Sequence, residues 1–255
     1  METQLAEEVA QQSPGRLDVI AVGAHPDDVE IGCGGTLARL AEQGYRVGII
    51  DLTDGEPTPG STGPEMRLVE ARAAADRLGM EQRVTLELPN RMLFDSYEAR
   101  VRLAIEFRRW RPRLVLGLGE KTMLASPDHW QAMQITDAAV FYARLCKWDD
   151  QFDNLPPHTI EAQLSYTLAF NRLELPAGPG HVVVDISRTL QKKLSSVRCY
   201  ASQFPPEKEY LFARLEAAAR YLGQAAGFPA GELLTSPRPI GTGNLMTTLF
   251  GGVES

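Results

Sequence analysis

A histidine and two adjacent aspartates follow an apolar run near the start of the chain. The run LDVIAVGA spans residues 17–24, and His25, Asp27 and Asp28 come directly after it in the segment HPDD. Histidine nitrogen and carboxylate oxygen are both ligands of divalent metals such as zinc. Two adjacent aspartates do not readily point at one atom, so one can bind a metal while its neighbour accepts the proton of a water molecule. The segment therefore indicates part of a hydrolytic metal site.

Two other interpretations of this segment remain open from the spacing alone. Either aspartate can cap the helix that follows, as a residue of a polar turn. The glycines of GCGG, residues 32–35, suggest a dinucleotide loop, with Asp51 or Asp54 after the next strand as its acidic partner. The three-glycine spacing G-x-G-x-x-G of such loops is absent, however. A nucleotide site is therefore the less favoured interpretation.

A zinc site needs a third protein ligand. The chain has four histidines: His25, His129, His158 and His181. His129 follows a predicted strand and stands in the first turn of a predicted helix, whereas His158 lies beside Pro156 and Pro157 and is expected to be an exposed turn residue. His181 begins a strand and has no carboxylate neighbour closer than Asp185. A His–Asp–His set that includes His129, with an open fourth position, is typical of catalytic zinc.

The elements that must position these residues alternate between strands and helices. Strands are predicted at 17–24, 46–53, 83–89 and 113–119, and helices at 35–44, 62–80, 96–112 and 126–148. This alternation predicts an α/β fold of the Rossmann-like kind, with a mostly parallel sheet and helices on both faces. The carboxyl ends of parallel strands share one edge of the sheet, so we expect His25 and His129 at that edge.

The second half of the chain adds a C-terminal elaboration to this fold. A polar connection at 149–159 leads to predicted strands at 162–170 and 181–187 and to predicted helices at 187–204 and 208–227. Residues 228–255 are rich in glycine and proline and are expected to wrap over the surface. We predict one domain from residue 17 to residue 255, preceded by an N-terminal arm at 1–16.

Composition narrows the class of protein. A formal net charge of -7 argues against general binding to nucleic acid or to anionic membranes, because such surfaces are usually basic. The three cysteines form no CxxC pair, so a cysteine zinc site is not expected. The N-terminus has no signal-peptide pattern, and no apolar run approaches the roughly 20 residues that span a bilayer. We therefore expect a cytoplasmic protein.

The motifs resemble those of a known family. The stretch AHPDDVEIGCGGTLA, residues 24–38, is similar to the AHPDDE-type signature of the PIG-L/LmbE-like zinc-dependent N-acetylglucosaminyl deacetylases. Further segments that resemble this family are GIIDLTDGE, RLVEARAAADRLG, RPRLVLG, PDHWQA and VVDISRTLQKKLSSVRCYASQF. The likeness is to the bacterial branch, which includes the bacillithiol-biosynthesis deacetylases that act on N-acetylglucosaminyl malate. It runs from about residue 17 to residue 204, and more loosely to about 240.

This resemblance implies roles for individual residues. His25, Asp28 and His129 correspond to the zinc ligands, although iron or another divalent metal suits the same ligand types. Asp27 corresponds to the general base that activates the attacking water. The implied partner is a small amino-sugar substrate, and the resemblance also implies a homo-oligomer, with hexamers among the family's forms.

Arg67 corresponds to an arginine that contacts the sugar in the family. A positive group there also suits an acidic aglycone such as malate. The competing interpretation is that Arg67 is a solvated partner of Glu70 or Glu65. Loops at 54–65, 89–97 and 149–160 are expected to shape the pocket around the substrate.

One position departs from the family pattern. The second motif usually reads H-P-D-H, whereas this chain reads SPDH with Ser126 in the first place, where the resemblance implies contact with the substrate. Serine can donate a hydrogen bond but cannot carry the positive charge of the histidine that it replaces. Losing a catalytic histidine commonly costs about 10²–10⁴ in rate. Ser-Pro is also a favourable helix opening, and Asp128 in the first turn suits the helix dipole. Lys121 or His181 is a candidate to supply, from elsewhere in the chain, the positive group that Ser126 lacks. Two hypotheses follow: an active deacetylase, or a degenerate member that binds a ligand with little turnover.

Overall fold

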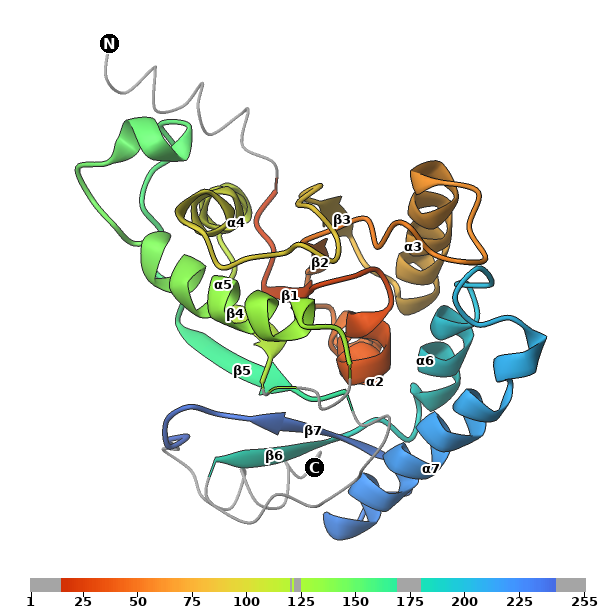
Figure 1. Cartoon of the computed structure of the whole chain (residues 1–255). Helices are drawn as coiled ribbons and strands as arrows, with labels where there is room; N and C mark the ends of the chain where they lie inside the picture. Colours follow the sequence, from red (N-terminus) through yellow and green to blue (C-terminus); the bar gives the residue numbers. More distant parts are fainter. Residues whose placement is uncertain (1–14, 120, 122–124, 169–179, 242–255) are drawn as a thin grey trace.

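A seven-stranded sheet lies between two layers of helices in the computed structural model of the chain (Figure 1). The structure describes residues 15–119, 121, 125–168 and 180–241. The strands are β1 Val19–Gly23, β2 Val47–Asp51, β3 Gln82–Thr85, β4 Leu114–Leu118, β5 Ala162–Tyr166, β6 His181–Asp185 and β7 Gly231–Thr235. The helices are α2 Asp28–Glu42, α3 Pro64–Leu78, α4 Tyr97–Trp110, α5 Asp128–Tyr142, α6 Leu190–Val197 and α7 Tyr210–Ala225, with short 3₁₀ turns η1 Asp149–Phe152 and η2 Pro206–Lys208.

The strand order is β3-β2-β1-β4-β5-β7-β6. The strands from β3 to β5 in this order all pair in parallel, whereas β7 is antiparallel to both β5 and β6. The chain winds outward from β1 in one direction and returns to the centre to continue at β4, so the strand order reverses between these two strands. Ligands of such sheets bind at this reversal, beyond the carboxyl ends of the strands. The predicted α/β class with a mostly parallel sheet is confirmed.

The helices form the two layers that burial of the strands requires. Helices α4 and α5 cover one face of the sheet, while α2, α3 and α6 cover the other and α7 packs beside β7 (Figure 1). All five residues of β1 and of β2 are buried, as expected for central parallel strands with helices on both sides. The main hydrophobic core therefore includes these two central strands and the helices packed against them.

The strand β7 corrects one prediction. Residues 228–255 are predicted to wrap over the surface, but Gly231–Thr235 forms a strand between β5 and β6, with its first four residues buried. The glycines and prolines around a five-residue run indicate a loop when local pattern is the only guide, because pairing with distant strands leaves no local signal. Residues 242–255 and most of the predicted arm at 1–16 lie outside the described residues.

Helix α2 is kinked at Cys33. Cys33 has non-helical backbone angles of φ -142° and ψ 17°, which interrupts the hydrogen-bond ladder. The freed backbone N–H groups of Gly35 and Thr36 donate to the carboxylate of Glu232 on β7, at 3.0 and 2.6 Å. Lys193 Nζ donates to the carbonyl of Ile31 at 2.7 Å and to Glu232 at 2.5 Å. A buried ion pair from the C-terminal part therefore satisfies the backbone groups that the kink exposes.

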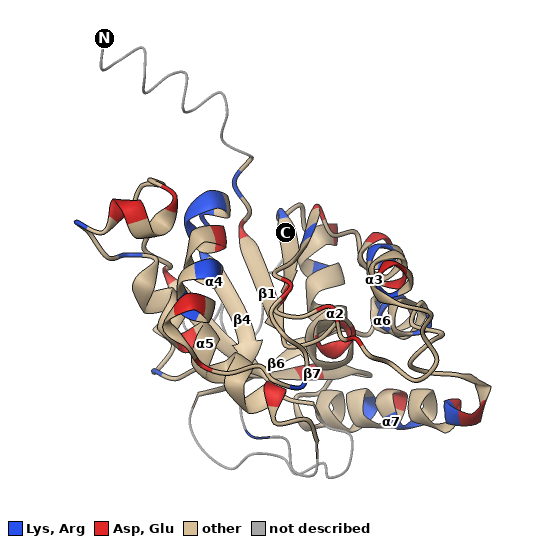
Figure 2. Ribbon diagram, turned by 45° about the horizontal axis from the view of Figure 1, so that its top comes forward, with Lys and Arg blue, Asp and Glu red and all other residues tan. Residues whose placement is uncertain are grey.

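Charged residues of both signs alternate on the outer helices. Figure 2 shows Lys and Arg interspersed with Asp and Glu on α3, α4 and α7. None of the helices that the structure describes has the length and apolar character needed to cross a membrane.

Candidate active site

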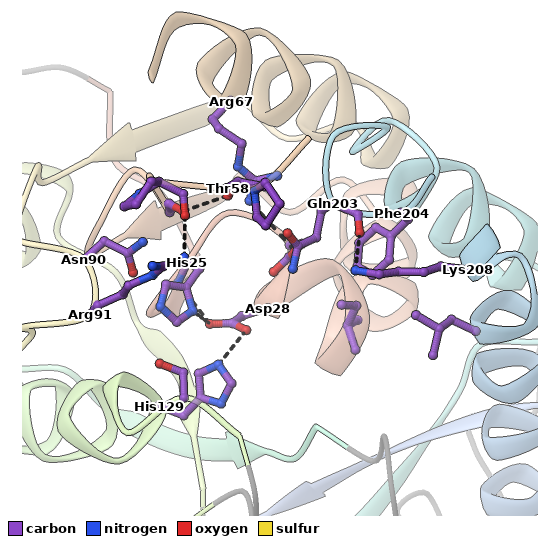
Figure 3. Close-up of a pocket in the computed structure, with 17 residues that line it drawn as sticks. His25, Asp28, Thr58, Arg67, Asn90, Arg91, His129, Gln203, Phe204 and Lys208 are labelled. Atoms are coloured by element: carbon purple, nitrogen blue, oxygen red, sulfur yellow. Dashed lines mark hydrogen bonds and ion pairs between the residues drawn. The ribbon is translucent and has the colours of Figure 1, made fainter. Parts of the chain in front are cut away.

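Two segments that follow β1 and β4 bring the predicted metal ligands together. His25 and Asp28 come after β1, and His129 stands in the first turn of α5 after β4. One ligand atom from each lies within 4.8 Å of the others, and the two imidazole rings are 5.2 Å apart between centroids (Figure 3). This is the point where the strand order reverses, as the topology of the sheet requires.

Asp28 is fixed by the backbone that precedes it. Its Oδ2 accepts hydrogen bonds from the backbone N–H groups of Ala24 and His25, each at 3.0 Å, and its Oδ1 lies 3.3 Å from His129 Nε2. Although burial favours protonation, the nearby histidines hold the pKa of the Asp28 carboxyl below its usual range. Asp28 is therefore an ionised carboxylate with a fixed orientation, as a metal ligand must be.

His25 is oriented by a carboxylate from the other segment. His25 Nε2 lies 3.1 Å from Asp128 Oδ2, while its Nδ1 faces Asp28 at 3.5 Å. Although burial lowers it, the hydrogen bonds to Asp128 and Asp28 raise the pKa of His25 to about 10. An Nε2–H that donates to Asp128 leaves Nδ1 to bind a metal, which is how ligating histidines are usually oriented.

Asp128 contacts the candidate metal ligand His25, which sequence reasoning does not predict. The sequence pattern assigns it to the helix dipole, but its side chain is buried and its Oδ2 also accepts the backbone N–H of Arg91 at 2.7 Å. The one available signal is its place directly before His129.

Asp27 has an unusual backbone conformation beside this cluster. Its φ is 118°, a value that L-residues rarely adopt, and its side chain is buried. Burial and the charge of Asp28 raise the pKa of Asp27 to about 8. Strained polar residues in such positions are typical of functional sites.

Arg67 reaches Asp27 from α3. Its Nη2 donates to the carbonyl of Pro26 at 2.6 Å and lies 3.9 Å from Asp27 Oδ2. Its Nη1 is 3.3 Å from Glu70, so the predicted pair exists, but Arg67 is only 1% exposed. The interpretation of a solvated surface pair is therefore wrong. Gly55, at φ 78°, makes room for the guanidinium, because a Cβ there would lie 3.2 Å from Nη2.

A cavity of about 390 Å³ opens onto the cluster (Figure 3). All six predicted site residues line it: His25, Asp27, Asp28, Arg67, Ser126 and His129. Loops 54–65 and 89–97 contribute to its wall as predicted, whereas no residue of 149–160 lines it. Gln203, Phe204 and Lys208 close the far side, and their sequence pattern gives them no role in advance.

Ser126 lies at the helix opening as predicted, and its contact with a substrate stays a prediction. It lines the cavity, and its Oγ accepts the backbone N–H of Asp128 at 3.3 Å, which supports the first turn of α5. His181 cannot replace a histidine here, because β6 runs in the direction of the parallel strands and His181 begins it, at the opposite edge of the sheet. Lys121 is exposed and does not line the cavity.

His158 is not the exposed turn residue that its neighbours predict. It is buried, and its Nε2 lies 2.7 Å from the carbonyl of Pro112. The two preceding prolines suggest a surface turn, but the His158 side chain contacts Pro112, which follows α4. His158 is therefore a packed, hydrogen-bonded residue that does not line the cavity.

The dinucleotide interpretation is contradicted at Asp51, Gly32 and Gly35. Both carboxylate oxygens of Asp51 accept hydrogen bonds from Arg83, at 2.6 and 2.9 Å, so this acid is not free to bind a ribose. Gly32 lies in α2, where a Cβ would come within 3.0 Å of the Tyr166 ring, and Gly35 meets Ile186 in the same way. Gly32 and Gly35 therefore allow close packing between α2 and its neighbours.

The residues present fit a divalent metal. Two imidazoles and one carboxylate form the donor set, and His129 Nδ1 is buried with no hydrogen-bond partner among the described residues. Three protein donors facing a cavity leave a position open for water or substrate.

Comparisons with known proteins identify the family of the chain. The family model of the GlcNAc-PI de-N-acetylases, PIG-L, matches residues 20–140. The diacetylchitobiose deacetylase of Thermococcus kodakarensis is 32% identical over 224 residues, which cover 84% of this chain and 80% of that protein. The conserved protein TT1542 from Thermus thermophilus superposes with a TM-score of 0.76 at 36% identity, covering 89% of this chain and 97% of the other. The chain belongs to the PIG-L/LmbE-like deacetylase family.

The fold alone does not decide the reaction. GalB, the 4-carboxy-2-hydroxymuconate hydratase from Pseudomonas putida, superposes with a TM-score of 0.71 over 90% of this chain and all of its own, at 22% identity. This likeness shows a shared fold, and that fold also serves a hydratase. The reaction must therefore be argued from the site and from the family.

Proposed function

We propose that this protein is a zinc-dependent hydrolase that removes the acetyl group from an N-acetylated amino-sugar conjugate. The observation that carries the proposal is the His25–Asp28–His129 cluster beside the buried carboxyl of Asp27, in a cavity open to small molecules. Membership of the family and the 32% identical diacetylchitobiose deacetylase support it. The finer assignment to N-acetylglucosaminyl malate, the bacillithiol-type substrate, is part of the proposal.

His25, Asp28 and His129 would hold the metal, with Asp128 orienting His25. A bound divalent metal supplies a Lewis acid for the amide carbonyl and lowers the pKa of water. Because ligands must lose their protons to bind a cation, metal affinity should rise with pH. Zinc suits the imidazole-rich set, and iron is a second candidate.

Asp27 is positioned to move the proton that hydrolysis requires. Water adds to the acetamide carbonyl carbon, the C–N bond breaks, and acetate and a free amine leave. Asp27 accepts a proton from the attacking water and can pass it to the departing nitrogen. Its raised pKa suits this second step, and a cation nearby favours the charged form that the first step needs.

The test is acetate release from N-acetylglucosaminyl conjugates and diacetylchitobiose by the metal-loaded protein. Asp27→Asn keeps the shape of the side chain, and it should lower the rate about 10²–10⁴-fold. Asp76→Asn, an exposed change on α3, is the matched control and should leave the rate unchanged. His25→Ala should lose stoichiometric zinc. Equal acetate release by wild type and Asp27→Asn would refute the proposal.

Ser126 supports the alternative of a binding protein with little turnover. Its Oγ already accepts the Asp128 N–H, and no other described residue offers an imidazole at this place. Ser126→His distinguishes the two functions. For an active enzyme built around serine, the change should lower kcat or leave it similar. A rise of orders of magnitude would favour the alternative.

The remaining assignments are proposals as well. Cytoplasmic location, a homo-oligomer such as a hexamer, and the lack of nucleic-acid and membrane partners rest on the sequence and its resemblance. Light scattering of the purified protein measures the oligomeric state directly.

A further inference from the structure

The turn after α6 is joined to α3 by a buried carboxylate. Glu70 on α3 accepts the backbone N–H of Ser202 at 2.8 Å with one oxygen and the Ser202 hydroxyl at 2.6 Å with the other. Both side chains are buried. This turn belongs to the segment CYASQF, whose Gln203 and Phe204 line the cavity, whereas Ser202 itself has no role in the site described above.

The same pair holds Arg67. Arg67 Nη1 lies 3.3 Å from Glu70 Oε2 and 3.4 Å from Ser202 Oγ, so one guanidinium nitrogen meets both residues. The ring of Tyr200, from the same turn, lies 5.2 Å from the guanidinium carbon. Arg67 is thereby fixed by two elements that are distant in the sequence.

The second guanidinium nitrogen of Arg67, Nη2, contacts the backbone next to Asp27. Arg67 Nη2 donates at 2.6 Å to the carbonyl of Pro26, which belongs to the peptide plane before Asp27. Fixing that plane restricts rotation about the N–Cα bond of Asp27, whose φ of 118° is costly for an L-residue. A strained conformation persists only where its surroundings impose it, and this hydrogen bond is such a restraint.

We propose that Glu70 and Ser202 are positioning residues of the active site, acting through Arg67 on the backbone of Asp27. The proposal rests on the deacetylase function above. It also gives the turn a purpose: Gln203 and Phe204, next to Ser202, line the cavity, so the wall that meets the substrate is tied to the residue that moves the proton.

A purely structural role is the competing explanation, and the chain offers a control for it. Ser196 on α6 is also buried, and its Oγ donates to the Lys193 carbonyl at 2.7 Å without contact to Arg67. Ser202→Ala and Ser196→Ala each remove one buried hydroxyl, but only the first removes a partner of Arg67.

The experiment is a double-mutant cycle on the zinc-loaded protein. Ser202→Ala should lower kcat about tenfold with little change in KM, and in an Arg67→Lys background the same change should lower it less than about twofold. Ser196→Ala should leave kcat unchanged in both backgrounds. Zinc content and unfolding midpoints are measured for every variant. Equal effects of Ser202→Ala in the two backgrounds would overturn the proposal.

A crystallographic measurement tests this inference independently of the proposed function. Crystal structures of wild type and Ser202→Ala should show that the Arg67–Pro26 hydrogen bond is lost or lengthened and that Asp27 leaves its positive φ. An unchanged Asp27 would refute the inference even in an active enzyme. If wild type releases no acetate from any conjugate, the deacetylase function fails, while these structures still decide whether Ser202 positions Asp27.

Discussion

Asp128 Oδ2 lies 3.1 Å from His25 Nε2 and joins the segments that follow β1 and β4. The same oxygen accepts the backbone N–H of Arg91, so three segments meet at one carboxylate. His25 cannot rotate without breaking this contact. The candidate metal ligand His25 is thereby oriented by a residue outside the set of three candidate ligands.

Replacing Asp128 should weaken metal binding without removing a ligand. Asp128→Asn keeps an oxygen for the Arg91 N–H but loses the charge that orients His25, and zinc affinity should fall about 10–100-fold. A competition titration with a zinc chelator measures this. Asp137→Asn, an exposed change on the same helix, should bind zinc like wild type. Wild-type affinity in Asp128→Asn would show that His25 needs no such partner.

Alanine substitutions at two glycines of α2 should differ in their effect on the free energy of unfolding. A Cβ at Gly32 would come within 3.0 Å of the buried Tyr166 ring, so Gly32→Ala should lower the free energy of unfolding by about 1–3 kcal/mol. At Gly34 the nearest atom is 3.6 Å away, so Gly34→Ala should be neutral or stabilising by up to about 1 kcal/mol. Urea denaturation of both variants measures the difference. Similar losses at the two positions would contradict it.

Adjacent lysines on α6 should differ in their effect on stability. Lys193 pairs with Glu232 in a buried site, and Lys193→Met should lower the free energy of unfolding by about 3–5 kcal/mol, because Glu232 stays buried without its cation. Lys192 pairs with Glu42 at the surface, and Lys192→Met should change stability little. Denaturation of the two variants in parallel measures this. The prediction would be wrong if both variants were as stable as wild type.

His158 should make stability dependent on pH. Burial lowers the pKa of His158, so near pH 6 the unfolded chain binds more protons at this residue than the folded protein does. This contribution is complete above the unfolded pKa of about 6.5 and is lost as the pH falls through the lowered folded value. His158→Gln, which keeps a donor for the Pro112 carbonyl, should flatten this slope. The measurement is urea denaturation between pH 5 and pH 8, and an equal slope in both proteins would argue against it.

Local pattern is a good guide where a single element sets the outcome. The apolar run at 17–24 predicts β1, and the strand–helix alternation predicts the parallel half of the sheet. Local pattern fails where pairing between segments distant in the sequence decides the structure. The residues of β7 read as a surface segment, because these five residues become a strand only by pairing with β5 and β6. His158 reads as exposed because its burial depends on the end of α4.

By itself the sequence determined the chemical types and their order: a histidine and two aspartates after one strand, and a histidine after another. Local spacing encodes these features, and strand direction places both sets at one edge of the sheet. Only the tertiary structure decided how they are held. Asp128 orients His25, and Arg67 is buried between Glu70, Ser202 and the Pro26 carbonyl. Such contacts join residues up to 135 positions apart, and no local pattern records them, because they form only when separate elements pack together.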